Sequence, residues 1–276
     1  MKNSLALTGS TGRLGGRVAR RLAEAGVPQR LLVRDAARAP KLPQTSAVVA
    51  AFADGAAVQA ALAGIDVVLM VSAAETPNRV SEHVAFVDAA AAAGVGHLVY
   101  VSFFGASPTA TFTLARDHFA TEQHIRRSGM QFTFLRDNLY ADFFPMMVGE
   151  DGVLRGPAGT GRVSAVAQED IAGAAVAVLG DPGAHSGRTY DLTGPEALSL
   201  KEAAEILTET MGRAVRYHAE TVEEAYRSRA PYGAPPWQVD AWVSTYTAIA
   251  AGEMAAVSPA IEQLTGRPPR PLRDLR

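Results

Sequence analysis

A short stretch of the sequence concentrates side chains that could move protons. Residues 113–125, TLARDHFATEQHI, contain two histidines, an aspartate, a glutamate and an arginine. On a helix, His118 and Glu122 share a face because they are four residues apart, whereas His124 points elsewhere. Histidine titrates near neutral pH, so His118 is the candidate for acid–base work. The alternative is a partly buried, hydrogen-bonded histidine on a helix whose other charged side chains face solvent.

Glycines near the N-terminus form a second chemical pattern, suited to phosphate. The segment TGSTGRLGG spaces its glycines between an expected strand and an expected helix. Glycine allows a tight turn, close approach of the backbone to a pyrophosphate, and close packing of the helix on the strand. Free N–H groups and the helix dipole then face the anion. The alternative is a turn that needs glycine only for its geometry. We expect this segment to bind a dinucleotide through Gly9, Ser10, Thr11, Gly12, Arg13, Leu14 and Gly15.

The end of the second expected strand favours NADP(H) over NAD(H). An acid that binds the ribose is expected about 20 residues after the glycines, but Arg34 stands there. A guanidinium can bind the 2′-phosphate of NADP(H) with two hydrogen bonds. Arg38 and Lys41 could add positive charge. Asp35 follows directly and could bind a ribose instead, and a purely solvated Arg34 is the other alternative.

These candidates need a fold that gathers loops at one edge of a sheet, and the sequence predicts such a fold. Short β-branched or leucine-rich runs alternate with alanine-rich helical stretches, which is typical of a doubly wound Rossmann parallel sheet of the α/β class. The expected strands are residues 4–8, 30–33, 47–50, 66–71, 97–102 and 132–135, and the expected helices are 14–25, 56–63, 80–93 and 112–128. The glycines at 26, 64, 94 and 129 follow helices, where a left-handed cap is wanted.

The pattern changes after about residue 150. We therefore expect an NAD(P)-binding domain over 1–150 and a smaller α/β substrate lobe over 151–276 that partly completes the sheet. The expected strands are 153–155, 163–166, 188–192 and 215–218, and the expected helices are 168–179, 199–211 and much of 221–252. The tail, GRPPRPLRDLR, is expected to be extended because prolines interrupt it.

Composition excludes several function classes. The 276 residues carry a formal net charge of −2, so nothing favours nucleic acid or an anionic membrane surface as a partner. The absence of cysteine excludes disulfides, thiolate catalysis and cysteine-ligated zinc. No histidine and carboxylate grouping has metal-ligand spacing, so we expect no metal. With no signal peptide or long apolar run in sight, we expect a cytoplasmic protein.

Four segments carry a resemblance to a known family. The glycine segment, LLVRDAARA, AAAAGVGHLVYVS and TFLRDNLYADFF resemble the NmrA-like atypical short-chain dehydrogenase/reductases, in particular the branch of NADPH-dependent quinone oxidoreductases and triphenylmethane reductases. The resemblance runs from Lys2 to about Leu207 and continues more weakly beyond. It implies a Rossmann fold and NADP(H) as cofactor. We expect the substrate to be a small apolar or aromatic molecule.

The sequence departs from the ordinary family at its chemical centre. Ordinary members carry a serine after the fifth strand and a Tyr-x-x-x-Lys on the next helix. Ser102 matches the serine, but His118 stands at the lysine position and Leu114 at the tyrosine position. Loss of the proton donor should slow carbonyl reduction by on the order of 10²–10⁴. A quinone or a cationic dye needs no such donor. We predict Ser102 and His118 as catalytic residues that also contact the cofactor, with His118 holding its ribose.

The remaining site predictions follow from strand ends, where ligands bind in open α/β sheets. Val71, Ser72 and Ala73 should lie beside the cofactor ribose, and Phe52 could cover the adenine. A flat aromatic substrate would suit an apolar pocket; the alternative for each phenylalanine is core packing. The expected substrate contacts are Phe103, Phe104, Asn138, Tyr140 and Phe143, with Trp237 and Trp242 as candidates for a lid or its anchor.

Two function classes result. The first is an oxidoreductase that transfers hydride from NADPH to a quinone or similar conjugated acceptor. The second is a non-catalytic redox sensor that binds NADP(H) and contacts a partner protein, as the regulatory namesake of the family implies. A nucleotide-sugar epimerase is a distant third, because its chemistry depends on the missing tyrosine. No protein partner is indicated beyond a second copy of the chain, as a homodimer.

Overall fold

The structure, a computed structural model, describes residues 4–275 and divides into two compact units. Unit 1 takes in residues up to 103 together with 117–136 and 171–190, and unit 2 takes in 104–116, 137–170 and the residues from 191 onward. The chain thus alternates between the units, whereas the sequence placed one boundary near residue 150. The reason is that a helix and a strand late in the chain join the first sheet.

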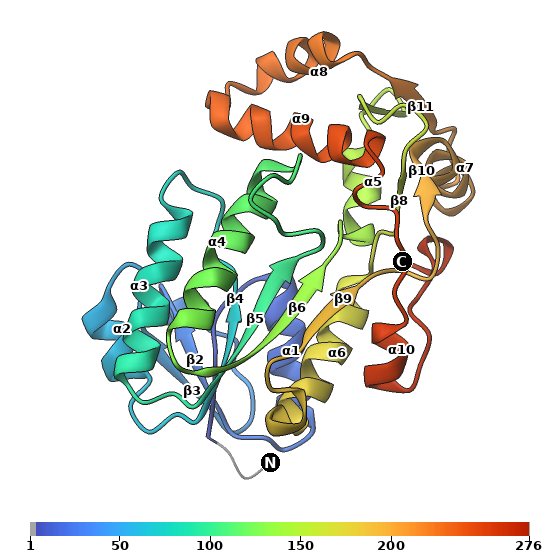
Figure 1. Cartoon of the computed structure of the whole chain (residues 1–276). Coiled ribbons are helices and arrows are strands. Elements are labelled where there is room, and N and C mark those ends of the chain that lie inside the picture. The colour runs from blue at the N-terminus through green and yellow to red at the C-terminus, as the bar shows by residue number, and fades with distance from the viewer. Residues whose placement is uncertain (1–3, 276) are drawn as a thin grey trace. The chain divides into compact units, whose positions relative to one another are not determined.

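Unit 1 is built on a seven-stranded sheet in the order β3-β2-β1-β4-β5-β6-β9 (Figure 1). The neighbouring pairs from β3 across to β5 are parallel. The strand order reverses between β1 and β4, which is the switch point where open α/β sheets bind ligands. The predicted doubly wound Rossmann sheet is confirmed. Its strands are β1 (Leu5–Leu7), β2 (Gln29–Val33), β3 (Thr45–Val49), β4 (Val67–Val71), β5 (His97–Phe103), β6 (Gln131–Asp137) and β9 (Thr189–Leu192).

Helices cover both faces of this sheet (Figure 1). They are α1 (Arg13–Glu24), α2 (Gly55–Ala61), α3 (Arg79–Ala92), α4 (Thr113–Arg127) and α6 (Gln168–Gly180), with short 3₁₀ turns η1 (Ala36–Arg38) and η3 (Pro182–His185). On one face, alternate strand residues such as Leu98 and Tyr100 pack in one buried cluster with Phe86 of α3 and Ile125 of α4. This packing holds α3 and α4 beside β5, where the candidate catalytic residues lie.

Four glycines follow the C-terminal ends of helices, as predicted. Gly26, Gly64, Gly94 and Gly129 have φ angles of 70°, 72°, 81° and 83°. These left-handed values suit glycine because it has no side chain to clash. Each turn therefore returns the chain from a helix to the next strand.

Unit 2 contains two small sheets and most of the late helices. In one sheet β11 (Arg216–Ala219) pairs in parallel with β7 (Val153–Gly156), and in the other β10 (Leu198–Ser199) pairs antiparallel with β8 (Arg162–Val163). The helices are η2 (Ala141–Phe143), α5 (Phe144–Met147), α7 (Leu200–Met211), α8 (Val222–Arg229), η4 (Ala230–Tyr232), α9 (Pro236–Ala250), α10 (Ala260–Thr265) and η5 (Leu272–Asp274). The 3₁₀ turn η5 interrupts the tail that the sequence predicted as extended. Among residues 4–275, no helix is long and apolar enough to cross a membrane.

Candidate active site

Two glycines have no room for a side chain: Gly9, in the loop between β1 and α1, and Gly15, in the first turn of α1. A Cβ atom at Gly15 would lie 2.4 Å from the carbonyl oxygen of Gly9, and one at Gly9 would lie 2.9 Å from Cβ of Val71. Gly9 also has a φ of 68°, and its carbonyl accepts the N–H of Gly12 at 2.9 Å. The loop therefore leads directly into the N-terminus of α1, where unpaired N–H groups favour an anion.

Ser10 adds an orphan hydroxyl to this loop. The residue is 3% exposed, and its Oγ has no hydrogen-bond partner among the described residues. Buried hydroxyls almost always have a partner, so this one calls for an explanation. A phosphate oxygen held in the glycine loop would provide the partner. Of the other predicted contacts, Leu14 is buried, and Thr11, Gly12 and Arg13 are exposed.

Thr8 ties the glycine loop to the end of β4. Its Oγ1 donates to the carbonyl oxygen of Val71 at 3.0 Å and accepts the N–H of Val71 at 2.9 Å. Val71 ends β4, and Ser72 and Ala73 follow it directly. All three residues, which are predicted to contact the ribose, are half-buried. The structure therefore brings the glycine loop and the end of β4 together at the switch point of the sheet.

The end of β2 carries the residues predicted to select the nucleotide. Arg34 is exposed, as are Arg38 and Lys41. The carboxylate of Asp35 accepts the N–H of Ala37 at 2.9 Å and so caps η1. The carboxylate of Asp35, which could compete for a ribose, is thus hydrogen-bonded to its own turn, while the side chain of Arg34 is accessible to a phosphate.

The predicted adenine contact lies further along unit 1. The ring of Phe52 stacks on Phe86 with 4.6 Å between the centroids and lies 5.8 Å from the ring of His83. Phe52 is half-buried, so one face of its ring is already packed against protein. Only the remaining surface of the ring is open to a nucleotide base.

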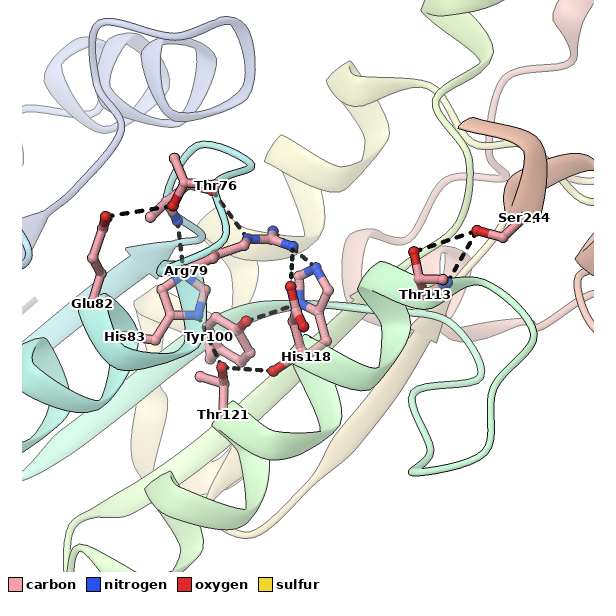
Figure 2. Close-up of polar contacts among 11 residues, drawn as sticks. Thr76, Arg79, Glu82, His83, Tyr100, Thr113, His118, Thr121 and Ser244 are labelled. Carbon is pink, nitrogen blue, oxygen red and sulfur yellow. Dashed lines mark hydrogen bonds and ion pairs between the residues drawn. The ribbon is translucent and has the colours of Figure 1, made fainter. Parts of the chain in front are cut away.

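His118 is buried within a polar network between α3, α4 and β5 (Figure 2). Its Nε2 lies 3.1 Å from Nη2 of Arg79, and its Nδ1 lies 2.9 Å from the hydroxyl of Tyr100. A guanidinium can only donate, so Nε2 must accept and Nδ1 must carry the proton. Burial, and then the nearby charge of Arg79, hold the pKa of His118 well below its usual range. The imidazole is therefore neutral, and both nitrogens are engaged.

A second histidine on α3 holds the loop after β4 (Figure 2). Nε2 of His83 accepts the N–H of Ala73 at 2.9 Å, so its Nδ1–H is directed to Oγ1 of Thr121 at 2.9 Å. Thr121 in turn donates to the carbonyl of Asp117 at 2.8 Å. Burial, with the charge of Arg79, lowers the pKa of His83 to about 3. His83 is thus a neutral link between the end of β4 and α4.

Ser102 belongs to a separate ionic network in the same unit. Its Oγ donates to Oε1 of Glu122 at 2.6 Å. Arg136 grips the same carboxylate through Nε at 2.8 Å and Nη2 at 2.6 Å. Ser102 and Glu122 are both fully buried. The hydroxyl proton of Ser102 is therefore committed to a carboxylate whose charge is already balanced.

The predicted substrate contacts occupy different environments. Phe103, in unit 1, is half-buried, and its ring centroid lies 6.1 Å from that of His118. In unit 2, Phe104 is half-buried and its N–H donates to the carbonyl of Asp137 at 2.8 Å. Tyr140 and Phe143 are half-buried and form an edge-to-face pair at 5.2 Å. These aromatics are therefore partly open, as a contact with an apolar ligand requires.

Asn138 is the exception among these residues. It is fully buried in unit 2. Its amide nitrogen donates to Oγ of Ser164 at 2.9 Å and to the carbonyl of Met254 at 3.0 Å. Both amide hydrogens are thus used to hold protein segments together, and its role as a substrate contact stays a prediction. The neighbouring Phe144 is also core, at 1% exposed.

The two tryptophans that the sequence indicated as candidates for a lid or its anchor lie in unit 2. Trp237 and Trp242 on α9 are half-buried, and the ring of Trp242 meets that of Tyr232 edge to face at 6.0 Å. Within residues 4–275, no group of three or more histidine, aspartate or glutamate side chains is arranged to hold a metal ion.

Comparison with known proteins identifies the family. A sequence model of the NmrA-like family matches residues 1–252 of the chain. The chain belongs to the NmrA-like family. This confirms the resemblance carried by the glycine segment, the strand-end arginine and the segment that ends in Phe144.

Proteins similar to this chain include reductases. The NAD(P)H azoreductase of Xenophilus azovorans is 35% identical over 269 residues, which cover 96% of this chain and 93% of that protein. The NADPH complex of the quinone oxidoreductase QOR2 of Escherichia coli is 30% identical with a TM-score of 0.89, covering 98% and 97% of the two chains. The NADP(H) complex of the Citrobacter sp. triphenylmethane reductase is 31% identical with a TM-score of 0.88, covering 98% of each chain.

The sequence did not reveal several polar residues of this network. His83 fell within the expected helix 80–93, Arg79 stood directly before it, and Tyr100 fell within the expected strand 97–102. A signal was present, because Arg79 and His83 lie four residues apart on an otherwise alanine-rich helix and so share one face. Charged or polar side chains on the inward face of a helix are rarely buried without partners.

Proposed function

We propose that the protein is an NADPH-dependent oxidoreductase that reduces a quinone or a similar conjugated aromatic acceptor. One arrangement in unit 1 carries the proposal: a glycine loop with the buried orphan hydroxyl of Ser10, and Arg34 at the end of the adjacent strand. The reductase activities of the similar family members, and the NADPH and NADP(H) bound in two of their structures, support it.

Different residues suit different parts of the cofactor. The glycine loop and the N-terminus of α1 suit the pyrophosphate, with Ser10 Oγ completing its hydrogen bonds. Arg34 suits the 2′-phosphate, which favours NADPH over NADH. Bound NADPH supplies a hydride, two electrons with one proton, to the acceptor. The protein's task is then to hold both reactants close and aligned.

The acceptor class follows from the side chains at the family's tyrosine, lysine and serine positions. Leu114 is apolar and buried there, His118 is neutral with its proton directed at Tyr100, and the proton of Ser102 is committed to Glu122. Hydride addition to an isolated carbonyl would lack a general acid to protonate the developing alkoxide. A quinone instead forms a delocalised phenolate, which water can protonate afterwards. A cationic dye needs no proton at all.

The direct test is oxidation of NADPH by the purified protein with a panel of quinones, cationic dyes, azo compounds and simple aldehydes. We expect turnover with conjugated acceptors and at least 10²-fold slower reaction with aldehydes, the lower bound of what a general acid contributes. NADH in place of NADPH should raise KM for the cofactor. Tight binding of NADPH without turnover on any acceptor would instead favour the redox-sensor function.

A further inference from the structure

Arg79 is a buried arginine whose hydrogen bonds are incomplete. It is the first residue of α3 and is 5% exposed. Its Nε donates to the carbonyl oxygen of Ala73 at 3.2 Å, and its Nη2 donates to Nε2 of His118 at 3.1 Å. Its Nη1 is shielded from solvent and has no hydrogen-bond partner among residues 4–275. Two N–H groups of a permanent cation therefore lack an acceptor.

The nearest carboxylate compensates this charge poorly. Oδ2 of Asp117 lies 4.0 Å from Nη1, beyond hydrogen-bond distance. Burial raises the pKa of Asp117 despite the opposing effect of Arg79. A buried cation with unsatisfied donors costs free energy, and an added oxygen acceptor would recover it. The site is thus electrostatically prepared for an oxygen atom that the protein does not itself supply.

Arg79 lies where the sequence lacks an expected positive charge. The resemblance implies a lysine at the position of His118, where it would bind the nicotinamide ribose and lower the pKa of the tyrosine. Here that position holds a neutral imidazole. The guanidinium of Arg79 is hydrogen-bonded to it, and Arg79 belongs to α3 rather than to α4 (Figure 2). This part of the site therefore contains a permanent positive charge, carried by Arg79 rather than by a lysine of α4.

We propose that Arg79 supplies the positive charge of the candidate active site and that its Nη1 donates a hydrogen bond to an oxygen atom of the bound ligand. The oxygen is a ribose hydroxyl of NADPH or the acceptor oxygen on which charge develops. This inference rests on the proposed NADPH-dependent reduction. Because Nη1 is shielded from solvent, the groups around it must shift when the ligand oxygen reaches it. The contacts with Ala73 and His118 hold the guanidinium in place for it.

Three variants test this role. Arg79→Met removes the charge with little change in volume, Arg79→Lys keeps the charge without the fork of donors, and Arg127→Met makes the same exchange at an exposed arginine of α4. The dissociation constant of NADPH is measured by fluorescence titration, and kcat with a quinone is measured at saturating NADPH. Circular dichroism and thermal unfolding show which variants fold.

We expect Arg79→Met to lose about 10- to 100-fold in one of these quantities, the usual worth of a charge-assisted hydrogen bond. A raised dissociation constant assigns the oxygen to NADPH. A lowered kcat with unchanged NADPH binding assigns it to the acceptor. Arg79→Lys should recover part of the loss, and Arg127→Met should behave as the wild type. A folded Arg79→Met with unchanged binding and unchanged kcat would overturn the proposal.

A measurement on the unaltered protein covers the case in which Arg79→Met does not fold. The guanidinium N–H resonances of Arg79 should shift when NADP⁺, or NADP⁺ with a quinone, is added. No shift under either condition would overturn the inference. A wild type that binds NADPH but reduces no acceptor would refute the proposed reduction alone, because NADPH affinity and these resonances still decide the role of Arg79.

Discussion

Nη2 of Arg79 lies 3.1 Å from Nε2 of His118, and this contact fixes which nitrogen of the imidazole carries the proton. Since arginine cannot accept, Nε2 is the acceptor and Nδ1–H points to the hydroxyl of Tyr100 at 2.9 Å. The sequence indicated His118 as a residue that could donate a proton or hold a ribose hydroxyl. In the structure it is a neutral link between an arginine and a tyrosine.

Substitution of His118 should therefore weaken NADPH binding or turnover through position rather than through proton transfer. His118→Ala removes the acceptor for Arg79, whereas His118→Gln can keep an oxygen near that place. We expect the alanine variant to lose about tenfold or more, the worth of a hydrogen bond to a charged group, and the glutamine variant to lose less. Profiles of kcat against pH from 5 to 8 should have the same shape in wild type and His118→Gln. An inflection near pH 6.5 that disappears in the variant would contradict this.

The buried histidines should make the protein sensitive to acid. The pKa of His83 is lowered to about 3 by burial and by Arg79, whereas the unfolded chain binds the proton near pH 6.5. Between these values the unfolded state holds more protons, so stability falls as the pH falls from about 6.5 towards 3. One such histidine contributes up to about 1.4 kcal/mol per pH unit.

Urea unfolding at pH 7, 6 and 5 measures this slope. His83→Gln should reduce it, although the loss of the bond to Ala73 lowers stability at pH 7. His124→Gln is the matched control, because His124 is only half-buried and pairs with Asp88. Equal slopes in wild type and His83→Gln would show that His83 takes up its proton over the same pH range in the folded and unfolded states, and would contradict the prediction.

Gly15→Ala should impair cofactor binding by distorting the glycine loop. The added Cβ would lie 2.4 Å from a backbone oxygen, so the backbone must move. Overpacking of this kind costs about 1–3 kcal/mol, and the distortion falls on the groups that face the phosphates. Gly55→Ala is the control, since its Cβ would meet nothing within 4 Å. NADPH titration should separate the two variants, and equal affinities would contradict a phosphate role for this loop.

Local patterns in the sequence predicted most of unit 1. Strand and helix periodicity, with the capping glycines, placed β1 to β6 and α1 to α4 within a few residues, because each pattern reflects local geometry. The short elements η1, α5 and α10 were missed, as they lack a repeating apolar face. The sequence indicated that residues after 150 partly complete the first sheet, but which segments join each unit depends on contacts far apart in the sequence.

The candidate site was predictable where the chemistry is local and not where it depends on pairing. The glycine loop and Arg34 follow from spacing along the chain, as does the absence of a tyrosine at Leu114. The engagement of Ser102 with Glu122, and of His118 with Arg79, joins residues 20 and 39 positions apart. The sequence contains those side chains but not their distances, so it could not show that both predicted catalytic residues are already hydrogen-bonded.

Arg34→Ala should change the choice of cofactor. Arg34 is exposed at the end of β2, while the carboxylate of Asp35 caps η1. Loss of a guanidinium–phosphate contact costs about 1.5–3 kcal/mol, so the NADPH dissociation constant should rise about 10- to 100-fold. NADH has no 2′-phosphate, and its affinity should change little. Arg127→Ala serves as the exposed control. A parallel loss for both cofactors would mean that Arg34 supports the loop rather than the phosphate.

Ser102 should matter more for stability than for the reduction of quinones. Ser102→Ala removes the 2.6 Å bond to Glu122 and leaves that buried carboxylate with Arg136 alone. We expect the free energy of unfolding to fall by about 1–3 kcal/mol, the cost of an unsatisfied buried group. Ser46→Ala, at an exposed position of β3, should leave the free energy of unfolding unchanged.

The kinetic effect distinguishes this role from that of a proton donor. Because a quinone needs no proton during hydride transfer, the fall in kcat for Ser102→Ala should stay below the roughly 10²-fold that loss of a general acid produces. Urea unfolding and quinone reduction by the same preparation measure both quantities. A fall in kcat beyond that limit with unchanged stability would place Ser102 in the chemical step, and the bond to Glu122 would then have to open before the acceptor is reduced.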